Sequence, residues 1–286
     1  MRDAVISFPA LGITVNPSSG LNIFGLTIYY YGLLIAAGLL LAAFYCTRRS
    51  REFGIMENDF HDMLLFAIPL CVVGARLYYI TFNFDIYRGN ILSIFNLREG
   101  GMAIYGTVIA AIITVLVFCR VKKIPPGAML DLGSIGMFIG QAVGRWGNFT
   151  NREAFGVETE IFCRMGLTLP GRETIYVHPT FLYESLWNAL GALLLHLCSA
   201  KRRRRFDGEL FWLYLAWYGL GRMAIEPLRT DSLYIPGTPI RVSQALANVS
   251  MIVSMIVLLR RRFSGNGAGE LYADTLHDRL PAESGE

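Results

Sequence analysis

The sequence has little charge and few breaks in its apolar character. Only 17% of its 286 residues are Asp, Glu, Lys or Arg, whereas 53% are hydrophobic. A soluble domain usually carries about 25% charged residues, so this composition excludes an ordinary soluble protein. Several apolar runs approach or exceed the ~18–20 residues that cross a bilayer. The composition therefore predicts a polytopic integral membrane protein.

Two further features are missing. The five cysteines match no metal-ligand spacing, and four of them lie in apolar runs, where cysteine behaves as a small buried hydrophobe. The first twenty residues contain Pro9 and Pro17 and lack a continuous apolar core after a basic start, so they do not form a cleavable signal peptide. We interpret residues 1–24 as an ordered arm on the membrane surface.

The apolar runs predict an all-α fold of seven transmembrane helices. The expected spans are residues 25–46, 60–82, 102–119, 127–147, 179–199, 209–226 and 240–259. The breaks between them are basic, Gly- or Pro-containing segments. We expect one seven-helix catalytic domain over residues 25–259, with a polar cap at 151–178 and a polar tail at 260–286.

Basic residues alternate between the two sets of loops, and this alternation predicts the orientation. One set of loops holds the basic clusters Arg48, Arg49 and Arg51; Arg120, Lys122 and Lys123; Lys201 with Arg202 to Arg205; and Arg260 to Arg262. In the other set, arginines are fewer and acidic residues lie near them. The N-terminus is therefore expected outside, and the tail is expected in the cytoplasm. The cap between the fourth and fifth helices then lies on the extracytoplasmic side.

A polar motif follows the fourth span at its expected outer end. It runs from Gly144 to Gly156 and reads GRWGNFTNREAFG. Arg145 and Asn148 are three residues apart and share one helix face, and Glu153 follows them. Charge at this depth is costly and calls for a functional or structural reason.

Ionisable residues inside the other spans cluster at the same level. Six of the ionisable residues within the spans form this set, and all except Asp131 fall in the outer half: Arg76, Asp131, Arg145, Glu184, Arg222 and Glu226. Isolated snorkelling side chains would explain one or two of these residues, but a shared polar site explains the set better. Tyr218 lies on the same helical stripe as Arg222 and Glu226. Tyr31, beside Gly32, fits either an interfacial aromatic belt or this site.

Arginines at this level suggest a phosphate ligand. A guanidinium binds phosphate in a bidentate manner, and a phosphate reached from the outer leaflet belongs to a phospholipid headgroup. The residues alone do not distinguish an enzyme from a lipid transporter or flippase. A metal-dependent headgroup phosphotransferase is disfavoured because the acids lie beside arginines instead of clustering. A transporter is disfavoured by the outer-half bias and by the absence of a repeat.

The motif Gly144–Gly156 resembles the signature of the prolipoprotein diacylglyceryl transferase family. Further blocks resemble the family in the same order, from the first to the sixth span: Tyr31-Gly32, Gly74-Ala75-Arg76, Glu99-Gly100-Gly101-Met102, Asp131, His178-Pro179 to Tyr183-Glu184, and Tyr218 to Glu226. The family's seven-span topology, with its N-terminus outside, agrees with the orientation expected here.

The resemblance implies a reaction. The family moves the diacylglyceryl group of phosphatidylglycerol to the thiol of the lipobox cysteine of a preprolipoprotein, and glycerol phosphate leaves. This is the first step of bacterial lipoprotein maturation. It implies a multi-pass protein of the bacterial cytoplasmic (inner) membrane, with its active site on the extracytoplasmic side. Phosphatidylglycerol, the preprolipoprotein and membrane lipids are the expected partners; no nucleic acid, metal or organic cofactor is implied.

The resemblance also assigns roles at matching positions. Arg145 and Arg222 are expected at the headgroup phosphate and its developing charge. Asn148 and Glu153 orient the headgroup or hold the motif's backbone. The other implied roles are arginine partners, pocket lining and substrate binding: Glu184 and Glu226 as partners that fix arginine rotamers, Tyr31 and Tyr218 in the lipid pocket, and Arg76 at the substrate.

Tyr105 departs from the family pattern. Many members have a histidine shortly after the Gly-Gly that opens the third span, and that histidine is a candidate base. A tyrosine has an ordinary pKa near 10 and is a poor base unless nearby arginines lower that value. Tyr105 is thus either a base assisted by Arg145 or Arg222, or a hydrogen-bonding contact to substrate. We favour the contact, with the thiol proton lost to water or to a carboxylate.

Overall fold

The computed structural model describes residues 4–24, 26–89, 91–96, 100–200, 204–235, 237–263 and 271–275. Three sequence predictions fall partly outside these residues. They concern Glu99 in a family block, Lys201 to Arg203 in a basic loop, and most of the tail after Phe263. The described chain forms two compact units: residues 1–46 with 133–269, and residues 47–132 with 270–286. Each unit is described by itself.

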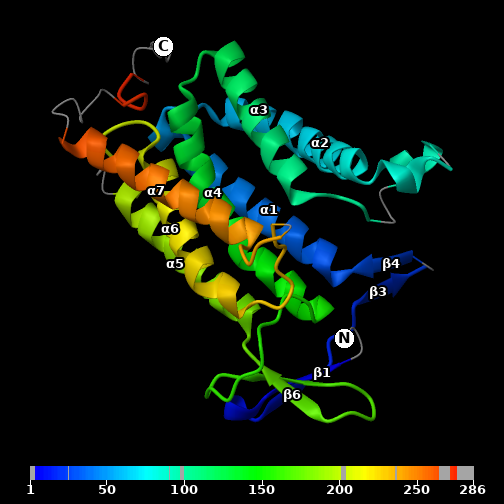
Figure 1. Cartoon of the computed structure of the whole chain (residues 1–286). Helices are drawn as coiled ribbons and strands as arrows, with labels where there is room; N and C mark the ends of the chain where they lie inside the picture. The colour runs from blue at the N-terminus through cyan, green and yellow to red at the C-terminus, as the bar shows by residue number, and fades with distance from the viewer. Residues whose placement is uncertain are drawn as a thin grey trace. The chain divides into compact units, whose positions relative to one another are not determined.

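Seven long helices form where the apolar runs predict them (Figure 1). Their bounds are α1 Tyr30–Arg49, α2 Glu57–Phe82, α3 Ile104–Lys122, α4 Pro126–Asn151, α5 Thr180–Ala200, α6 Glu209–Ile225 and α7 Val242–Phe263. Short 3-10 turns at 50–53, 84–87, 91–95 and 226–228 connect or extend them.

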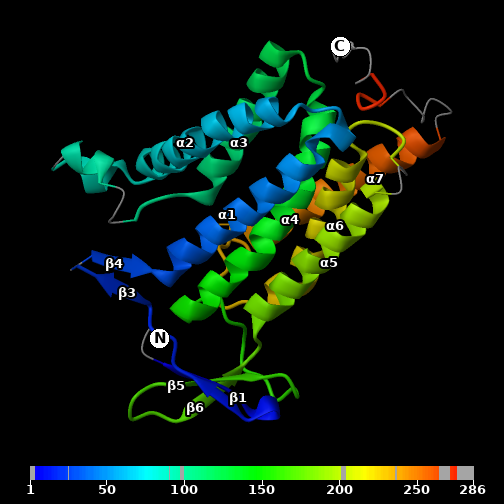
Figure 2. The ribbon, with the colours of Figure 1, turned by 180° about the vertical axis from the view of Figure 1, so that it is seen from behind.

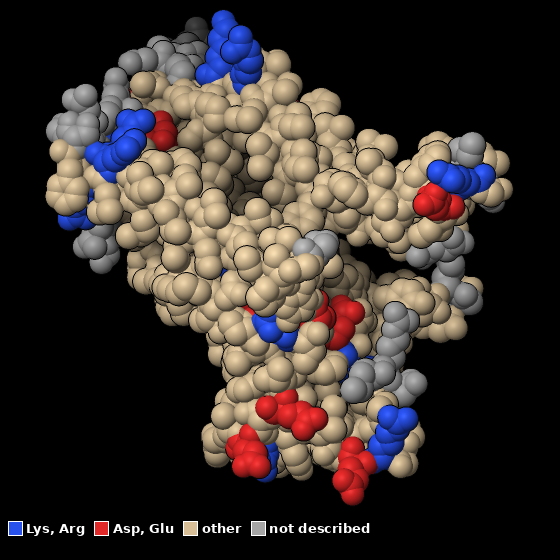
Figure 3. All heavy atoms as spheres, viewed as in Figure 1, with Lys and Arg blue, Asp and Glu red and all other residues tan. Residues whose placement is uncertain are grey.

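Five of the described helices are long and apolar enough to cross a membrane: α1, α2, α3, α5 and α7. The other two fall short because α6 has 17 residues and α4 carries Asp131, Arg145 and several glycines and amides. Large apolar side chains stay exposed along the helices, as lipid contact requires. On the face shown in Figure 3, uncharged side chains cover most of the helical surface. The chain is therefore a multi-pass membrane protein.

The first unit is built around a helix bundle of α1, α4, α5, α6 and α7, which run side by side in both views (Figures 1 and 2). Close backbone approaches bring α1 against α4, since a Cβ added to Gly38 would lie 3.1 Å from the Gly140 oxygen. Trp187 of α5 and Trp217 of α6 stack with ring centroids 4.3 Å apart. Each indole N–H donates to the other tryptophan's carbonyl at 3.0 Å. This reciprocal pair of hydrogen bonds fixes the register of α5 against α6.

Two small sheets correct the all-α expectation. A four-stranded antiparallel sheet has the order β2-β1-β5-β6, with strands β1 Val5–Phe8, β2 Ile13–Val15, β5 Met165–Thr168 and β6 Thr174–Val177. Strands β3 Gly20–Ile23 and β4 Leu26–Tyr29 form a separate hairpin. This hairpin occupies the expected start of the first span, so α1 begins at Tyr30 instead of residue 25.

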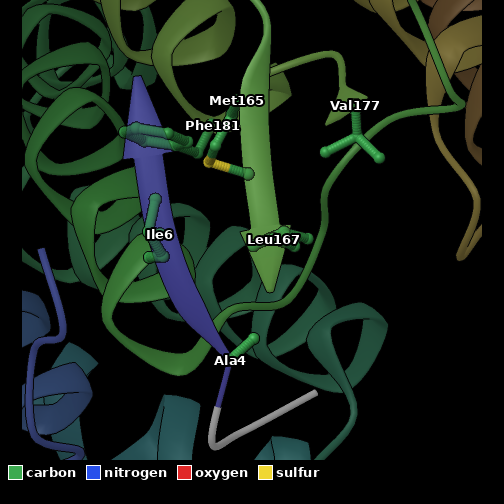
Figure 4. Packing of buried hydrophobic residues seen from close by; sticks show 6 residues of the cluster. All are labelled: Ala4, Ile6, Met165, Leu167, Val177 and Phe181. Carbon is green, nitrogen blue, oxygen red and sulfur yellow. The ribbon is translucent and has the colours of Figure 1, made fainter. Parts of the chain in front are cut away.

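The four-stranded sheet joins the N-terminal arm to the segment between α4 and α5. Ser7 of β1 pairs with Gly166 of β5, although about 160 residues separate them in sequence. The sheet packs on the start of α5 through an apolar cluster (Figure 4). The cluster comprises Ala4, Ile6, Met165, Leu167, Val177 and Phe181. Strands β1 and β2 of the predicted N-terminal arm and strands β5 and β6 thus form one sheet.

The second unit is centred on the pair α2 and α3. Their glycines allow backbone contact, because a Cβ on Gly106 would lie 2.2 Å from the Gly74 oxygen. At the basic end, Lys122 lies 2.8 Å from carboxylate oxygens of both Asp59 and Asp62. Close packing through small residues is the usual way in which membrane helices approach one another.

Candidate active site

Three helices of the first unit bring the central charged residues together. Arg145 lies near the end of α4, Glu184 in the first turns of α5, and Arg222 in the last turn of α6. The Ser185 hydroxyl donates to the Ala142 carbonyl at 2.8 Å and fixes α5 against α4. The packing of these helices therefore decides which charged groups meet.

Glu184 is the centre of the cluster and is only 6% exposed. Its carboxylate forms an ion pair with Arg145. Arg222 approaches it at 3.3 Å, and Arg229, from the loop after α6, approaches it at 2.9 Å. A buried carboxylate needs such partners because desolvation without compensation costs several kcal/mol per ion. The predicted pairing of Glu184 with arginines is confirmed.

Two other carboxylates compensate Arg222 and Arg229. Glu226 lies 2.8 Å from Arg222, one helical turn away, and accepts hydrogen bonds from the hydroxyls of Ser232 at 2.9 Å and Ser243 at 2.6 Å. Asp231 accepts hydrogen bonds from Arg229 Nε at 3.0 Å and Nη2 at 2.8 Å. The pairing of Glu226 with Arg222 is the one that their spacing predicts.

Arg145 is the arginine of this cluster best placed for an added anion. It shares Glu184 with two other guanidinium groups, whereas Arg222 and Arg229 each have a further carboxylate. Its side chain is 23% exposed, compared with 12% for Arg222 and 11% for Arg229. Its positive charge is thus the least compensated and the most accessible of the three. These properties suit a group that binds phosphate.

The motif Gly144–Gly156, which spans the last turns of α4 and the turn after it, continues this network through neutral and acidic side chains. Arg145 Nη1 donates to Asn148 Oδ1 at 3.2 Å, and Asn148 Nδ2 donates to Glu153 Oε1 at 2.9 Å. The residues on either side of Glu153 are left-handed, with φ of 51° at Arg152 and 54° at Ala154. Such conformations at non-glycine residues cost of order 1–3 kcal/mol and persist only where surrounding contacts enforce them. The backbone around Glu153 is therefore held in an uncommon shape.

The two predicted pocket tyrosines lie beside this cluster. The ring of Tyr31 covers Gly147, where an added Cβ would lie 2.8 Å from the ring. A small cavity of about 10 Å³ is lined by Tyr218, Arg222, Glu184 and four neighbours. Nε of Arg222 is buried and has no hydrogen-bond partner among the described residues. A cavity of this size holds about one water molecule.

Arg76 and Tyr105 belong to the second unit. The five N–H groups of Arg76 face backbone carbonyls: Ser93, Ile94, Asn96, Gly100 and Gly101, at 2.6–3.2 Å. These contacts favour a role in ordering residues 93–101, and direct substrate binding by Arg76 remains a prediction. Tyr105 lies in the first turn of α3 with its ring 6.2 Å from that of Tyr78.

Sequence reasoning missed Arg229 and Asp231. Arg229 lies outside the predicted spans, and the nearby Asp231 made it look like an ordinary loop arginine. The available signal was position, because Arg229 follows the predicted end of the sixth helix by three residues and so stays at the same membrane level. Its approach to Glu184 depends on the position of the turn 226–228, which is held by tertiary contacts. One of these contacts is the hydrogen bond that Arg241 donates to the Glu226 carbonyl.

Comparison with known proteins identifies the family. A model of the family described as prolipoprotein diacylglyceryl transferase matches residues 19–260. The chain belongs to the prolipoprotein diacylglyceryl transferase family. The match includes every residue of the arginine cluster and the whole motif Gly144–Gly156.

Bacterial relatives share much of this chain. Proteins of Bacillus cytotoxicus and Bacillus cereus are each 40% identical to it over 245 residues, which is 83% of this chain and 89% of the relative. A Bacillus anthracis protein is 39% identical over the same shares. All three relatives are named phosphatidylglycerol–prolipoprotein diacylglyceryl transferase. This chain is thus similar to these members of the family over most of their length.

Proposed function

We propose that this chain transfers the diacylglyceryl group of phosphatidylglycerol to the thiol of the lipobox cysteine of preprolipoproteins. The observation that carries the proposal is the convergence of Arg145, Arg222 and Arg229 on Glu184 in a chain of this family. Guanidinium groups fixed by buried carboxylates are preorganised for a phosphate. The reaction is the first step of lipoprotein maturation.

The chemistry is a displacement at the glyceryl carbon that bears the phosphate. The thiol sulfur bonds to this carbon, its bond to the phosphate oxygen breaks, and glycerol phosphate leaves with the bonding electrons. The thiol proton passes to water or to a carboxylate. Arg145 and Arg222 stabilise the charge that develops on the leaving phosphate. No cofactor takes part in this scheme.

The remaining side chains hold these two arginines and the substrate. Glu184 and Glu226 fix the guanidinium groups, and Arg229 compensates Glu184. Asn148 and Glu153 orient the headgroup from the motif. The three aromatic groups have simpler roles: Tyr31 and Tyr218 line the lipid pocket, and Tyr105 hydrogen-bonds the substrate.

The setting of the site follows from the alternation of basic loops. We place the chain in the bacterial cytoplasmic membrane with seven spans, the N-terminus outside and the C-terminus inside. The ends of α4 and α6 that carry the arginines then face the extracytoplasmic side. There the site meets both the outer-leaflet lipid and a secreted preprolipoprotein.

A reconstituted assay tests the activity. Purified protein, phosphatidylglycerol and a lipobox peptide should yield a peptide carrying a thioether-linked diacylglyceryl group, detected by mass spectrometry. We expect Arg145→Ala to lower the rate by about 10²-fold or more, as removal of a charge-stabilising donor does elsewhere. Arg145→Lys should recover little, because an ammonium lacks the bidentate geometry.

Two results would contradict the proposal. No product from the wild-type protein, with lipid and peptide active in a control reaction, would remove the transferase assignment. Full activity of both Arg145→Ala and Arg222→Ala would leave the transferase but remove the phosphate-binding role of the arginines.

A further inference from the structure

Arg152 precedes Glu153 in the motif and has an unusual combination of properties. It is left-handed, with φ of 51°, and yet its long charged side chain is only 4% exposed. Arginine is rarely buried unless its guanidinium group is well paired. The burial therefore needs partners, and the structure provides them.

The partners of Arg152 come mostly from the two ends of the β1–β2 hairpin, which we call the N-terminal hairpin. Nε donates to the Ala4 carbonyl at 2.9 Å, just before β1. Nη2 donates to Asn16 Oδ1 at 2.7 Å and to the Pro17 carbonyl at 2.5 Å, just after β2. Nη1 donates to the Thr150 carbonyl at 2.9 Å in its own turn. One guanidinium group thus joins both ends of the β1–β2 hairpin to the turn that follows α4.

This turn is connected to the arginine cluster by a short chain of hydrogen bonds. The Glu153 N–H donates to the Asn148 carbonyl at 3.0 Å, and the Asn148 amide donates back to the Glu153 carboxylate at 2.9 Å. Asn148 Oδ1 accepts from Arg145 at 3.2 Å. Whatever fixes the backbone at Arg152 therefore fixes where Glu153 and Asn148 lie beside Arg145.

We propose that Arg152 is a positioning residue for the active site, which fastens the N-terminal hairpin to the motif and so holds Glu153 and Asn148 against Arg145. The proposal rests on the proposed function for its catalytic consequence. Arg152 acts through its neighbours, because its buried guanidinium group is directed at protein acceptors. Residues 4–17 are accordingly a structural part of the site, although they lie far from it in sequence.

The decisive variant is Arg152→Gly. Glycine adopts φ of 51° without strain, so this change keeps the backbone conformation accessible while it removes the side chain with its guanidinium group. We expect kcat/KM for phosphatidylglycerol to fall by roughly tenfold or more, since small displacements of positioned groups have effects of this size. Added methylguanidinium should restore part of the activity, because it matches the missing group and its four acceptors.

Two further variants separate positioning from a general loss of structure. Asn16→Ala removes one acceptor and should give a smaller loss in kcat/KM. The double variant Asn16→Ala/Arg152→Gly should have nearly the same kcat/KM as Arg152→Gly alone, because the two side chains act through one contact. Arg164→Ala is the matched control: Arg164 directly precedes β5 and packs over the ring of Tyr176 in β6, and its loss should leave activity and methylguanidinium sensitivity unchanged.

Limited proteolysis tests whether Arg152 fastens the N-terminal hairpin, and it does so independently of the transferase reaction. The N-terminal hairpin should be cleaved faster in Arg152→Gly than in wild type, and methylguanidinium should slow that cleavage. If the wild-type chain has no transferase activity, the proposed function fails, but this proteolysis result still supports the anchor. Activity of Arg152→Gly within about twofold of wild type would overturn the proposal. A loss that methylguanidinium does not restore, and that adds fully to that of Asn16→Ala, would also overturn it.

Discussion

Some charged residues of the site can be recognised from the sequence, whereas others can be recognised only from the folded structure. Arg145, Glu184, Arg222 and Glu226 are detectable in sequence because a charge inside an apolar run is costly and conspicuous. Arg229 and Arg152 are not conspicuous, because each lies in a polar loop where arginine is common. Arg229 reaches Glu184 and Arg152 reaches Ala4, Asn16 and Pro17, all distant in sequence, so only the folded chain shows these contacts.

At the same scale, Arg229 and Asp231 lead to a pH prediction. Burial disfavours the charge on Asp231, but hydrogen bonds and charge from Arg229 outweigh it and hold the pKa of this carboxyl below its usual value. A lowered folded-state pKa contributes stability above the unfolded value, near 4, which is lost as the pH falls through the folded value. Asp231→Asn should therefore lower the unfolding temperature in detergent at pH 7, and this effect should shrink as the pH falls below about 4.

The expected size of this effect is small. The Asp231 side chain is 46% exposed, so solvent screens the pair and we expect no more than about 1 kcal/mol. Asp85→Asn is a suitable control, because Asp85 forms a pair with Arg88 that is far more exposed. A difference between Asp231→Asn and wild type that grows toward low pH would contradict the assignment.

At the scale of elements, apolar runs located all seven helices within a few residues. Their ends were less predictable: α1 starts at Tyr30 because the preceding apolar residues pair as β3 and β4. The short strands β1 and β5 carried no usable signal, since four residues of alternating pattern fit many structures. Their pairing joins segments about 160 residues apart, which no local pattern encodes.

Packing of α2 against α3 yields a second prediction. A Cβ on Gly106 would lie 2.2 Å from the Gly74 oxygen, and backbone atoms cannot move aside cheaply. Gly106→Ala should destabilise the chain by about 1–3 kcal/mol or more, as overpacking does. Gly133→Ala on α4 is the control, because none of the described residues outside its own helix has an atom within 4 Å of that Cβ. Thermal unfolding measured in detergent should show a lower transition temperature for Gly106→Ala and an unchanged one for Gly133→Ala. An equal transition temperature for both variants would show that α2 and α3 do not pack closely at Gly106.

At the scale of the whole molecule, the predicted orientation in the membrane is tested by cysteine labelling. The basic loops predict that the segment between α4 and α5 is extracytoplasmic. Cys163 lies in this segment and is exposed, whereas the other four cysteines are buried or half-buried. A membrane-impermeant maleimide should therefore label Cys163 in intact spheroplasts, and Cys163→Ser should abolish this labelling.

A cytoplasmic control completes the topology experiment. Arg51 follows α1 at the opposite end, and its side chain is 69% exposed. In the Cys163→Ser background, Arg51→Cys should be labelled only after the membrane is permeabilised. Labelling of Arg51→Cys in intact spheroplasts, together with labelling of the wild-type Cys163 only after permeabilisation, would reverse the proposed orientation.

The sequence by itself determined that this is a membrane protein, where its helices lie and which arginines fall within or beside the apolar runs. It did so because the cost of placing polar groups in hydrocarbon is paid residue by residue, so it leaves a local record in the sequence. Tertiary structure alone decided that three guanidinium groups meet on Glu184 and that Arg152 holds the N-terminal hairpin. Those contacts depend on how distant elements pack, and hydrogen-bond geometry between such elements has no local signature.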